Sequence, residues 1–310
     1  MIVQKTMTGR AWAEMILLAA IWGGSFLAIR VALDEVAPLT SVAHRTGWAM
    51  LALWAVVAAM RLPVPRDPRV WVGFLGMGLL NNVIPFGLMA WGQLYIETGL
   101  TSILNAATAI FGVIAAALFF ADERITLRKA IGIGFGFFGV ATAIGLDNFR
   151  SFDLRSLAQL AIIAGTVFYA LASVWARHFF QGLTPQVAAA GMLTGSTLIT
   201  LPLAWIVDGP VALDLQPATL GAIAYYALIA TAGAYLLYYR VLAVAGSGNL
   251  MLVTLLIPPV AITLGALVRA ETLGANAFAG FALLAIGLVI LDGRIGAALR
   301  RGVDRTRSRS

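Results

Sequence analysis

The 310-residue sequence contains no cysteine and only two histidines, His44 and His178. The absence of cysteine excludes disulfide frameworks, thiolate metal sites and cysteine nucleophiles. Two histidines are too few for a histidine-rich metal centre, and neither an HExxH motif nor a P-loop pattern occurs. We therefore expect no metal, no cofactor, no ATP-driven step and no enzymatic activity.

Charged residues are also scarce. Only 11% of the residues are Asp, Glu, Lys or Arg, whereas charged residues make up about a quarter of an ordinary soluble domain. Hydrophobic residues make up 61% of the chain, and its mean hydropathy is +0.91. A membrane-spanning helix needs about 20 apolar residues. The composition therefore predicts a polytopic membrane protein, with room for about nine or ten spans, and excludes a cytosolic globular protein.

Apolar windows separated by charged or Pro/Gly-rich breaks predict ten helices. The first window follows Lys5 and Arg10 and continues to about residue 29, which is too long for a signal peptide. We interpret it as a retained first helix. The predicted helices are 12–32, 39–60, 70–92, 99–120, 127–146, 156–177, 185–206, 217–239, 248–268 and 275–293.

The basic residues are distributed unevenly between the two sides of these ten helices. Sixteen Lys and Arg residues fall on the side of the N-terminus, six of them in the C-terminal tail, and four fall on the other side. The positive-inside rule then places both termini in the cytoplasm. We expect the protein itself to lie in the cell inner (plasma) membrane. A basic tail after the last span is ordinary in this arrangement, so we expect no nucleic-acid partner.

An internal repeat relates residues 118–146 to residues 266–294. With an offset of 148, Glu123 aligns with Glu271, Gly132 with Gly280 and Gly139 with Gly287. The repeat divides the chain into 1–150 and 151–310, with five helices each. Because five is an odd number, the second half enters the membrane inverted. Two inverted five-helix repeats are a transporter architecture, with the substrate bound between the halves near the midplane.

The segment Trp22-Gly23-Gly24-Ser25-Phe26, together with Arg45, the two Glu links and the glycines after them, resembles the EamA-type branch of the drug/metabolite transporter superfamily. Within that branch the chain is similar to bacterial aromatic amino acid exporters. The resemblance implies ten helices, two repeats and alternating access.

The sequence departs from the family pattern in one respect. The family often has a proline in the fourth helix of each repeat, and here only the ninth predicted helix has one, as Pro258-Pro259. The aligned residues of the fourth helix are Ile110 and Phe111. We expect the fourth helix to bend by another device, such as Asn105 or Gly112.

Polar side chains inside spans are the first candidates for a binding site, since they normally face a cavity or the bundle interior. His44 is interpreted either as a ligand of a substrate carboxylate or proton carrier, or as one partner in an interhelical hydrogen bond. Arg45 either binds a carboxylate or extends toward the interface. The two side chains point about 100° apart on a helix, so they do not face the same point.

Asn81 and Asn82 precede Pro85 by one turn. The proline removes a backbone donor, which leaves a carbonyl near residue 81 without its helical partner. The amides and this carbonyl either form a pocket for an amino-acid headgroup or repair the kink. Pro258 and Pro259 likewise free backbone carbonyls in the ninth predicted helix. The resulting kink is either a mobile gate or a static bend.

Aromatic side chains supply further candidates for stacking on a substrate ring. Most Trp and Tyr residues at span ends belong to interfacial belts, and those a turn inside are better candidates. The aromatic candidates, with Asn105 added for its place inside the fourth helix, are Trp91, Tyr95, Phe168, Tyr169, Tyr235 and Asn105. The GxGxGxxG pattern of 132–139 follows no strand and is interpreted as helix packing rather than a nucleotide site.

The sequence therefore predicts an all-α membrane carrier that exports small apolar metabolites, favouring aromatic and other neutral amino acids. Its partners are the small-molecule substrate and the lipid bilayer, and we take the protein as a monomer. Two alternatives stay open: a multidrug or other metabolite exporter of the same fold, and, less favoured, an integral membrane enzyme.

Overall fold

The computed structural model describes residues 9–121, 124–145, 153–245 and 253–292, and within these ranges it is helical without a strand. The described helices form ten rods. Eight of them are long and apolar enough to cross a membrane, and two shorter apolar helices lie near the C-terminus. Large apolar side chains such as Leu118, Phe138 and Ile206 are more than two-thirds exposed, as lipid-facing residues are.

The first five rods form the first half of the molecule. The third rod is interrupted by a π-helical segment, η1, and the fourth is broken into two helices. Their bounds are α1 Gly9–Ala32, α2 Pro38–Ala59, α3 Pro68–Gly78 with η1 Leu79–Val83 and α4 Ile84–Gly92, α5 Thr98–Asn105 with α6 Thr108–Phe119, and α7 Leu127–Ile144.

The remaining five rods form the second half, and its third rod again contains a π-helical segment, η2. Their bounds are α9 Leu154–Phe179, α10 Pro185–Val207, α11 Pro217–Ala224 with η2 Tyr225–Gly233 and α12 Ala234–Ala245, α14 Val253–Arg269, and α15 Ala275–Asp292. Where the structure describes their ends, the predicted helices match the ten rods to within a few residues. The eighth rod continues to Ala245, past the predicted end at 239, and the predicted start of the ninth at 248 lies outside the described residues.

Local sequence explains where several rods begin and end. Proline occupies the first turn of α2, α3, α10 and α11, where its missing N–H costs no hydrogen bond. Asp67 and Thr126 cap α3 and α7 by accepting hydrogen bonds from Arg69 N and Lys129 N. Gly145 ends α7 with φ +84°, a conformation that favours glycine.

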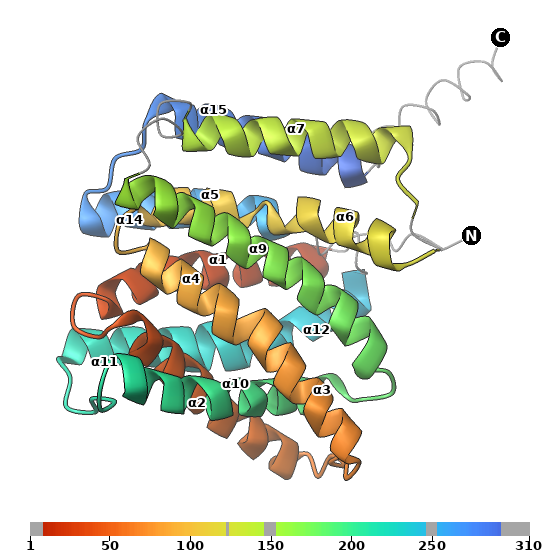
Figure 1. The fold of residues 1–310 in the computed structure, drawn as a ribbon, viewed down its shortest axis with the longest axis vertical. Helices are drawn as coiled ribbons and strands as arrows, with labels where there is room; N and C mark the ends of the chain where they lie inside the picture. Colours follow the sequence, from red (N-terminus) through yellow and green to blue (C-terminus); the bar gives the residue numbers. More distant parts are fainter. Residues whose placement is uncertain (1–8, 122–123, 146–152, 246–252, 293–310) are drawn as a thin grey trace.

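Packing of the rods repeats when the two halves are exchanged. Each rod of the first half corresponds to the rod five places later in the second half. The contact between the first and ninth rods corresponds to the contact between the sixth and fourth. The contact between the third and sixth rods likewise corresponds to the contact between the eighth and first. The second packs on the seventh, the fourth on the ninth and the fifth on the tenth. In Figure 1 the fifth and tenth rods, α7 and α15, lie together at the top, away from α2, α3 and α10 at the bottom.

Two glycine pairs hold α7 and α15 together. A methyl group added at Gly132 would lie 2.9 Å from the carbonyl oxygen of Gly287, and one at Gly139 would lie 2.8 Å from that of Gly280. The residue order is reversed between the helices, so they run antiparallel. The repeat aligns Gly132 with Gly280 and Gly139 with Gly287, so each pair is the symmetry mate of the other. This is helix packing of the kind predicted for the GxGxGxxG pattern.

The fourth and ninth rods bend differently. The fourth breaks between Asn105 and Thr108, where the Thr108 hydroxyl donates to the Asn105 carbonyl at 2.7 Å. The ninth runs as one helix, α14, through Pro258 and Pro259. The proline-free rod is therefore the one that breaks, at one of the two positions expected to replace the proline.

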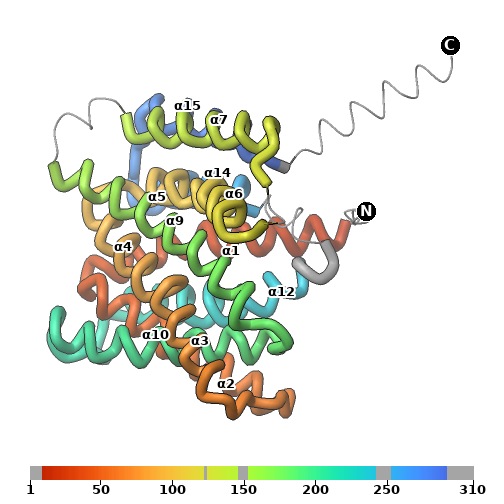
Figure 2. The backbone as a smooth tube through the Cα atoms, turned by 45° about the vertical axis from the view of Figure 1, so that its right-hand side comes forward, coloured from red at the N-terminus to blue at the C-terminus, as the bar shows by residue number. Residues whose placement is uncertain are grey.

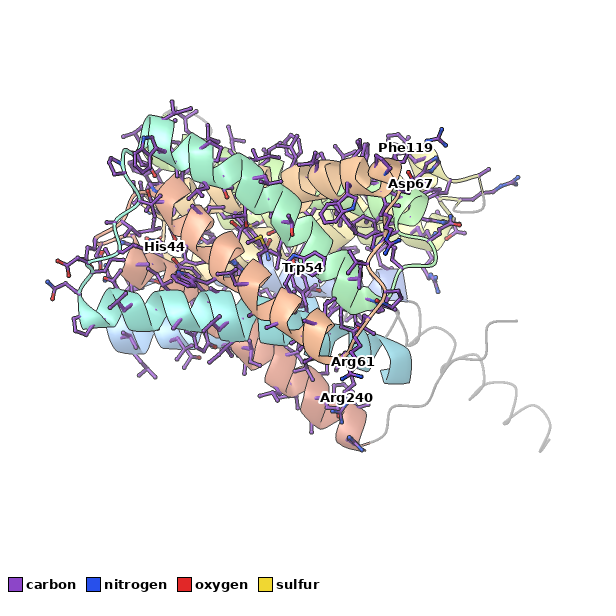
Figure 3. The ribbon with its side chains drawn as sticks, turned by 90° about the horizontal axis from the view of Figure 1, so that it is seen from below. His44, Trp54, Arg61, Asp67, Phe119 and Arg240 are labelled. Atoms are coloured by element: carbon purple, nitrogen blue, oxygen red, sulfur yellow. The ribbon has the colours of Figure 1, made fainter. Side chains whose placement is uncertain are left out.

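The links between rods gather at two ends of the bundle. The links 33–37, 93–97, 208–216 and 270–274 form one end, which we call the Asp34 end. The link 60–67 and the residues next to Phe119 and Arg240 form the other, which we call the Arg61 end. Figure 3 shows Arg61, Phe119 and Arg240 together, with His44 toward the opposite end, and Figure 2 shows the N-terminal part of α1 at the Arg61 end. Glu123 and the C-terminal arginines lie outside the described residues.

Candidate substrate cavity

A cavity of about 560 Å³ lies between the two halves of the bundle. Side chains from α1, α2, the third rod and the fourth rod line it on one side, and side chains from α9, α10, the eighth rod and α14 line it on the other. Most of the lining is apolar or aromatic, including Trp22, Phe86, Met89 and Met192. Its size and lining are those of a small-molecule site.

Four of the predicted substrate-binding residues line this cavity: Asn81, Asn105, Tyr169 and Tyr235. They come from four different rods, two in each half, and the structure brings them together. The other five predicted residues, His44, Asn82, Trp91, Tyr95 and Phe168, are not among the lining residues.

The two neighbouring asparagines have different environments. Asn81 lines the cavity, and its Nδ2 donates to Asn82 Oδ1 at 3.1 Å and lies 3.4 Å from the Tyr235 hydroxyl. Asn82 is fully buried, and its Nδ2 donates to Ser196 Oγ at 2.7 Å. The first amide therefore faces the cavity, whereas the second joins η1 to α10. Ile84 N donates to Leu79 O in the π-helical pattern, and Pro85 begins α4 directly after this segment.

His44 lies near the Asp34 end and is 5% exposed. Trp48 Nε1 donates to His44 Nδ1 at 3.3 Å, so Nδ1 is the acceptor and Nε2 carries the proton. Nε2 donates to the Ala212 carbonyl at 3.0 Å. Both ring nitrogens are therefore occupied, and the side chain joins α2 to the 208–216 link instead of facing the cavity.

The predicted aromatic residues outside the cavity pack on the bundle. Trp91 and Tyr95 lie with ring centroids 5.2 Å apart near the Asp34 end, and Phe168 is half-buried on α9. By contrast, Tyr238 and Tyr239, on the tyrosine face of α12, line the cavity beside Tyr235. The i, i+3, i+4 spacing of these three tyrosines was the sequence signal for that face.

Arg45 faces the cavity. Its Nε donates to Thr231 Oγ1 at 2.9 Å, and its guanidinium lies 3.8 Å above the centre of the Phe86 ring. A cation over an aromatic face is stabilised by the ring quadrupole. Phe86 lies on α4, in the same half as Arg45, and Thr231 lies in η2, in the other half, so the three side chains meet only in the tertiary fold.

Two amide oxygens at the cavity have no hydrogen-bond partner. Gln93 is 1% exposed, and its Nε2 donates to the Phe26 carbonyl at 2.9 Å, which leaves Oε1 unpaired. Asn105 Oδ1 is likewise buried and unpaired at the break in the fourth rod. Buried acceptors without partners are costly. Both residues line the cavity, although the two oxygens themselves are buried.

The prolines predicted to act in gating flank the cavity wall. Pro85 and Pro258 are buried, whereas Pro259 is exposed on the far face of α14. Ile257, next to Pro258, and Thr254, one turn before it, line the cavity. Met77, Met89 and Met192 also line the cavity, which could not be predicted because apolar residues occur on every face of these helices.

At the Asp34 end, carboxylates of one half bind helix N-termini of the other. Asp208 Oδ2 accepts from Thr40 N at 2.7 Å, and Glu271 Oε2 accepts from Thr98 N at 2.9 Å. The residues at the N-caps of α2 and α5 make no side-chain cap of their own. The second half thus supplies the negative charge that each helix N-terminus favours.

Ion pairs join the halves at the same end. Arg155 donates to both carboxylate oxygens of Glu97, at 2.7 and 3.1 Å. Asp34 accepts hydrogen bonds from Arg269 and from Arg30. The Arg269 guanidinium holds the pKa of Asp34 below its ordinary value, and the charge of Arg30 acts in the same direction.

The cavity lining extends toward the Arg61 end. Phe180 caps the C-terminus of α9, Ala188 lies in the first turn of α10, and Tyr239 lies on α12 near Arg240, and all three line the cavity. The contacts across the halves at this end include the Arg240–Glu14 ion pair at 2.6 Å and the hydrogen bond from Trp175 Nε1 to Gly73 O at 2.9 Å. The cavity lining therefore reaches toward the Arg61 end, and it also includes Gln93, in the link 93–97 at the Asp34 end.

Comparison with known proteins agrees with this architecture. The EamA-like transporter family matches the chain twice, at residues 10–145 and 156–291. A solved structure described only as "Crystal structure of protein" aligns with a TM-score of 0.65 at 18% identity, covering 92% of this chain and 96% of that one. At this identity the alignment shows a shared fold alone.

Three relatives match along most of their length. An "Uncharacterized transporter" of Archaeoglobus fulgidus is 24% identical over 284 residues, 91% of this chain and 98% of the relative. A "Probable terminal-alkyne amino-acid exporter" of Streptantibioticus cattleyicolor is 27% identical over 300 residues, 91% and 93%. A "Probable amino-acid metabolite efflux pump" of Escherichia coli is 24% identical over 287 residues, 89% and 92%.

The relatives are transporters rather than enzymes, and the two family matches cover nearly all of the described helices. The resemblance noted in the sequence is confirmed. The apolar helices and the cavity between the halves fit an integral membrane transporter. This chain belongs to the EamA-like transporter family.

Proposed function

We propose that the protein is a carrier of ten transmembrane helices that exports aromatic and other neutral amino acids across the inner membrane by alternating access. The observation that carries this proposal is the cavity of about 560 Å³, which is lined by both halves and combines apolar walls with a few polar side chains. An amino acid needs both kinds of surface.

The proposed topology has two inverted repeats, divided near residue 150, with both termini in the cytoplasm. The symmetric exchange of rod contacts and the antiparallel glycine pairs of α7 and α15 support the inversion. The excess of Lys and Arg on the side of the Arg61 end supports the orientation. The cavity then extends toward the cytoplasm, from which an exporter takes its cargo.

The substrate class is supported by the lining and by the relatives. Trp22, Tyr169, Tyr235 and Phe86 give ring surfaces on which an aromatic side chain stacks. Asn81, Gln93 and Asn105 add polar side chains to the lining. Two relatives carry names that include amino-acid efflux or export.

The test is counterflow in proteoliposomes that contain the purified full-length chain and are preloaded with unlabelled substrate, without a proton gradient. We expect saturable uptake of labelled phenylalanine, tyrosine and tryptophan in excess of lysine and a lipophilic cation. Exchange of the cation alone would keep the carrier and overturn the substrate class. Non-saturable flux of every solute would indicate a pore and overturn the carrier.

Orientation is tested separately with single cysteines, which the cysteine-free chain makes unambiguous. Val64→Cys lies in the link 60–67, and Leu213→Cys lies in the link 208–216. Both side chains are exposed. An impermeant thiol reagent added to intact cells is expected to label Leu213→Cys and to leave Val64→Cys unlabelled. The reverse result would overturn the proposed orientation.

A further inference from the structure

Arg45 is the one charged side chain among the residues that line the cavity. Along the described chain, no carboxylate forms an ion pair with it. A guanidinium keeps its charge in proteins. A buried charge without a counter-ion is costly, and a charged residue inside a membrane bundle marks a functional site unless it is paired.

The contacts that Arg45 does make leave one edge of the guanidinium available. Thr231 Oγ1 donates to the Tyr226 carbonyl at 2.7 Å and accepts from Arg45 Nε at 2.9 Å. This fixes the Nε side of the group against η2. The Phe86 ring covers one face of the guanidinium at 3.8 Å. The terminal nitrogens have no hydrogen-bond acceptor among the described residues.

Further hydrogen-bond donors lie around the guanidinium. Tyr169 and Tyr235 line the same cavity and are near enough to Arg45 to interact with its charge. The Tyr235 oxygen accepts from Asn81 at 3.4 Å, which leaves its own O–H to donate. The Tyr169 hydroxyl has only a contact of 3.9 Å with the Met89 sulfur. The Arg45 guanidinium and the hydroxyls of Tyr169 and Tyr235, which have no oxygen or nitrogen acceptor in the described part of the chain, therefore form a cluster of hydrogen-bond donors in the cavity.

We propose that Arg45, with the hydroxyls of Tyr169 and Tyr235, binds a carboxylate of the cargo, so that the protein selects solutes that carry one carboxylate. This inference rests on the proposed carrier function and specifies the chemistry of its substrate. A carboxylate has two oxygens, which match two N–H groups of a guanidinium. The bound carboxylate neutralises Arg45, so the loaded cavity carries no uncompensated charge from the protein.

The same arrangement predicts which solutes the site rejects. A neutral amide in place of the carboxylate leaves Arg45 unpaired, and a cationic amine without a carboxylate adds a second positive charge to the cavity. The neutral amide side chains of Asn81, Gln93 and Asn105 also line the cavity, so an amine elsewhere on the cargo is compatible with it.

The test measures binding to the purified full-length wild-type chain in nanodiscs with two matched series of probes. The aromatic series is phenylalanine, 3-phenylpropionate, phenylalanine amide and phenethylamine, and the aliphatic series is leucine, 4-methylpentanoate and leucine amide. We expect phenylalanine and leucine to bind about 10- to 100-fold more tightly than their amides, the range for a hydrogen bond to a charged group that is made or lost. Equal affinity of carboxylates and amides in both series would overturn the inference, and so would the absence of carboxylate binding.

Variants assign the preference to Arg45. Arg45→Gln is expected to abolish the preference for carboxylates over amides, whereas Arg45→Lys retains part of it because the charge remains. Arg240→Gln, at the Arg61 end and outside the cavity lining, is the matched control and is expected to keep the full preference. A carboxylate preference unchanged in Arg45→Gln would overturn the assignment. If a variant fails to fold, the wild-type series still decides whether the site selects carboxylates.

Failure of this inference is distinguishable from failure of the carrier proposal. Counterflow of an amide or a lipophilic cation, with no carboxylate binding, would leave the carrier standing and overturn the carboxylate site. Binding of 3-phenylpropionate or 4-methylpentanoate without binding of either amino acid would support the site and overturn the amino-acid substrate class.

Discussion

The two ends of the helix bundle are held together by different chemistry. At the Arg61 end, α3 and α7 begin with their own caps, Asp67 and Thr126. At the Asp34 end, α2 and α5 are capped by Asp208 and Glu271 from the opposite half. A local cap survives when the halves move apart, whereas a cap from the other half is lost.

This difference indicates that opening the Asp34 end costs free energy. Separation of the halves at the Asp34 end exposes two helix N-termini and breaks the ion pairs of Glu97 and Asp34. These contacts therefore stabilise the arrangement in which the Asp34 end is closed. The cargo has to offset that free energy when the carrier changes state.

The largest expected effect comes from locking the Asp34 end. Thr40→Cys combined with Asp208→Cys places two thiols where the α2 cap now joins the halves. Under oxidising conditions we expect counterflow to fall to background, with recovery after reduction, because the halves can no longer separate at that end. Thr40→Cys and Asp208→Cys as single variants are the matched controls, because each loses the same cap contact but cannot form the disulfide. Full counterflow in the oxidised Thr40/Asp208 pair would contradict alternating access at this end.

A smaller effect is expected from removing one cross-half cap. Asp208→Asn removes the charge that binds the N-terminus of α2, and the loss of a cap costs about 1 kcal/mol. The open state at the Asp34 end should then be populated about fivefold more. The measurement is the rate at which a cavity cysteine, Ser25→Cys, reacts with an impermeant thiol reagent added from the side that the Asp34 end faces.

Asp67→Asn is the control for that experiment. Asp67 is the corresponding cap at the Arg61 end and belongs to the same half as the helix that it caps. We expect this variant to leave the reaction rate unchanged. An equal rise in both variants would mean that the accelerated reaction reflects general loosening of the bundle and not the opening of one end.

The Glu97–Arg155 pair should contribute less. Its side chains are 24% and 40% exposed, and partly exposed pairs contribute at most about 1 kcal/mol because water screens them. Glu97→Gln and Arg155→Gln should each raise the Ser25→Cys reaction rate modestly, and the charge reversal Glu97→Arg/Arg155→Glu should restore it. Additive effects with no restoration would show that the pair does not hold the end closed.

The smallest effect concerns pH. Because the pKa of Asp34 is lowered by Arg269, its ion pair contributes stability above the usual Asp range of about 4, and that contribution is lost as pH falls through the lowered pKa. The Asp34 side chain is 47% exposed, so the contribution is below about 1 kcal/mol. The difference in Tm between wild type and Asp34→Asn should stay constant from pH 5 to 8 and shrink below about pH 4. A change within pH 5–8 would contradict this assignment.

Much of the helical architecture could be predicted from the sequence, because periodic apolar runs and charged breaks are local signals. The offset that aligned Gly132 with Gly280 predicted a repeat, but it did not predict that α7 and α15 pack on each other. The residues that line the cavity were harder to predict. Asn81 and Asn82 are neighbours with equal hydrogen-bonding capacity, and only the rotation of η1 decides that the first faces the cavity.

Other features depend on contacts between distant segments. His44 has its partner in the 208–216 link, and Asp208 and Glu271 have theirs at the start of helices in the other half. These caps lie 168 and 173 residues from the backbone N–H groups that they bind. No local sequence pattern predicts a contact over such a separation. The repeat identified Glu271 as a counterpart of Glu123 without showing what the carboxylate binds.

The π-helical segments have a consequence for how this chain tolerates change in its length. In η2 the Thr231 hydroxyl reaches back five residues to Tyr226 O, and the wider turn acts as one residue inserted into an α-helix. Deletion of a single residue within Tyr225–Gly233 would therefore restore α-helical winding, whereas a deletion in the rod that leaves η2 in place would rotate the residues after it by about 100°. Tyr235, Tyr238 and Tyr239 would then leave the cavity wall together. The tyrosine wall is thus set by the count of residues before it as much as by their identity.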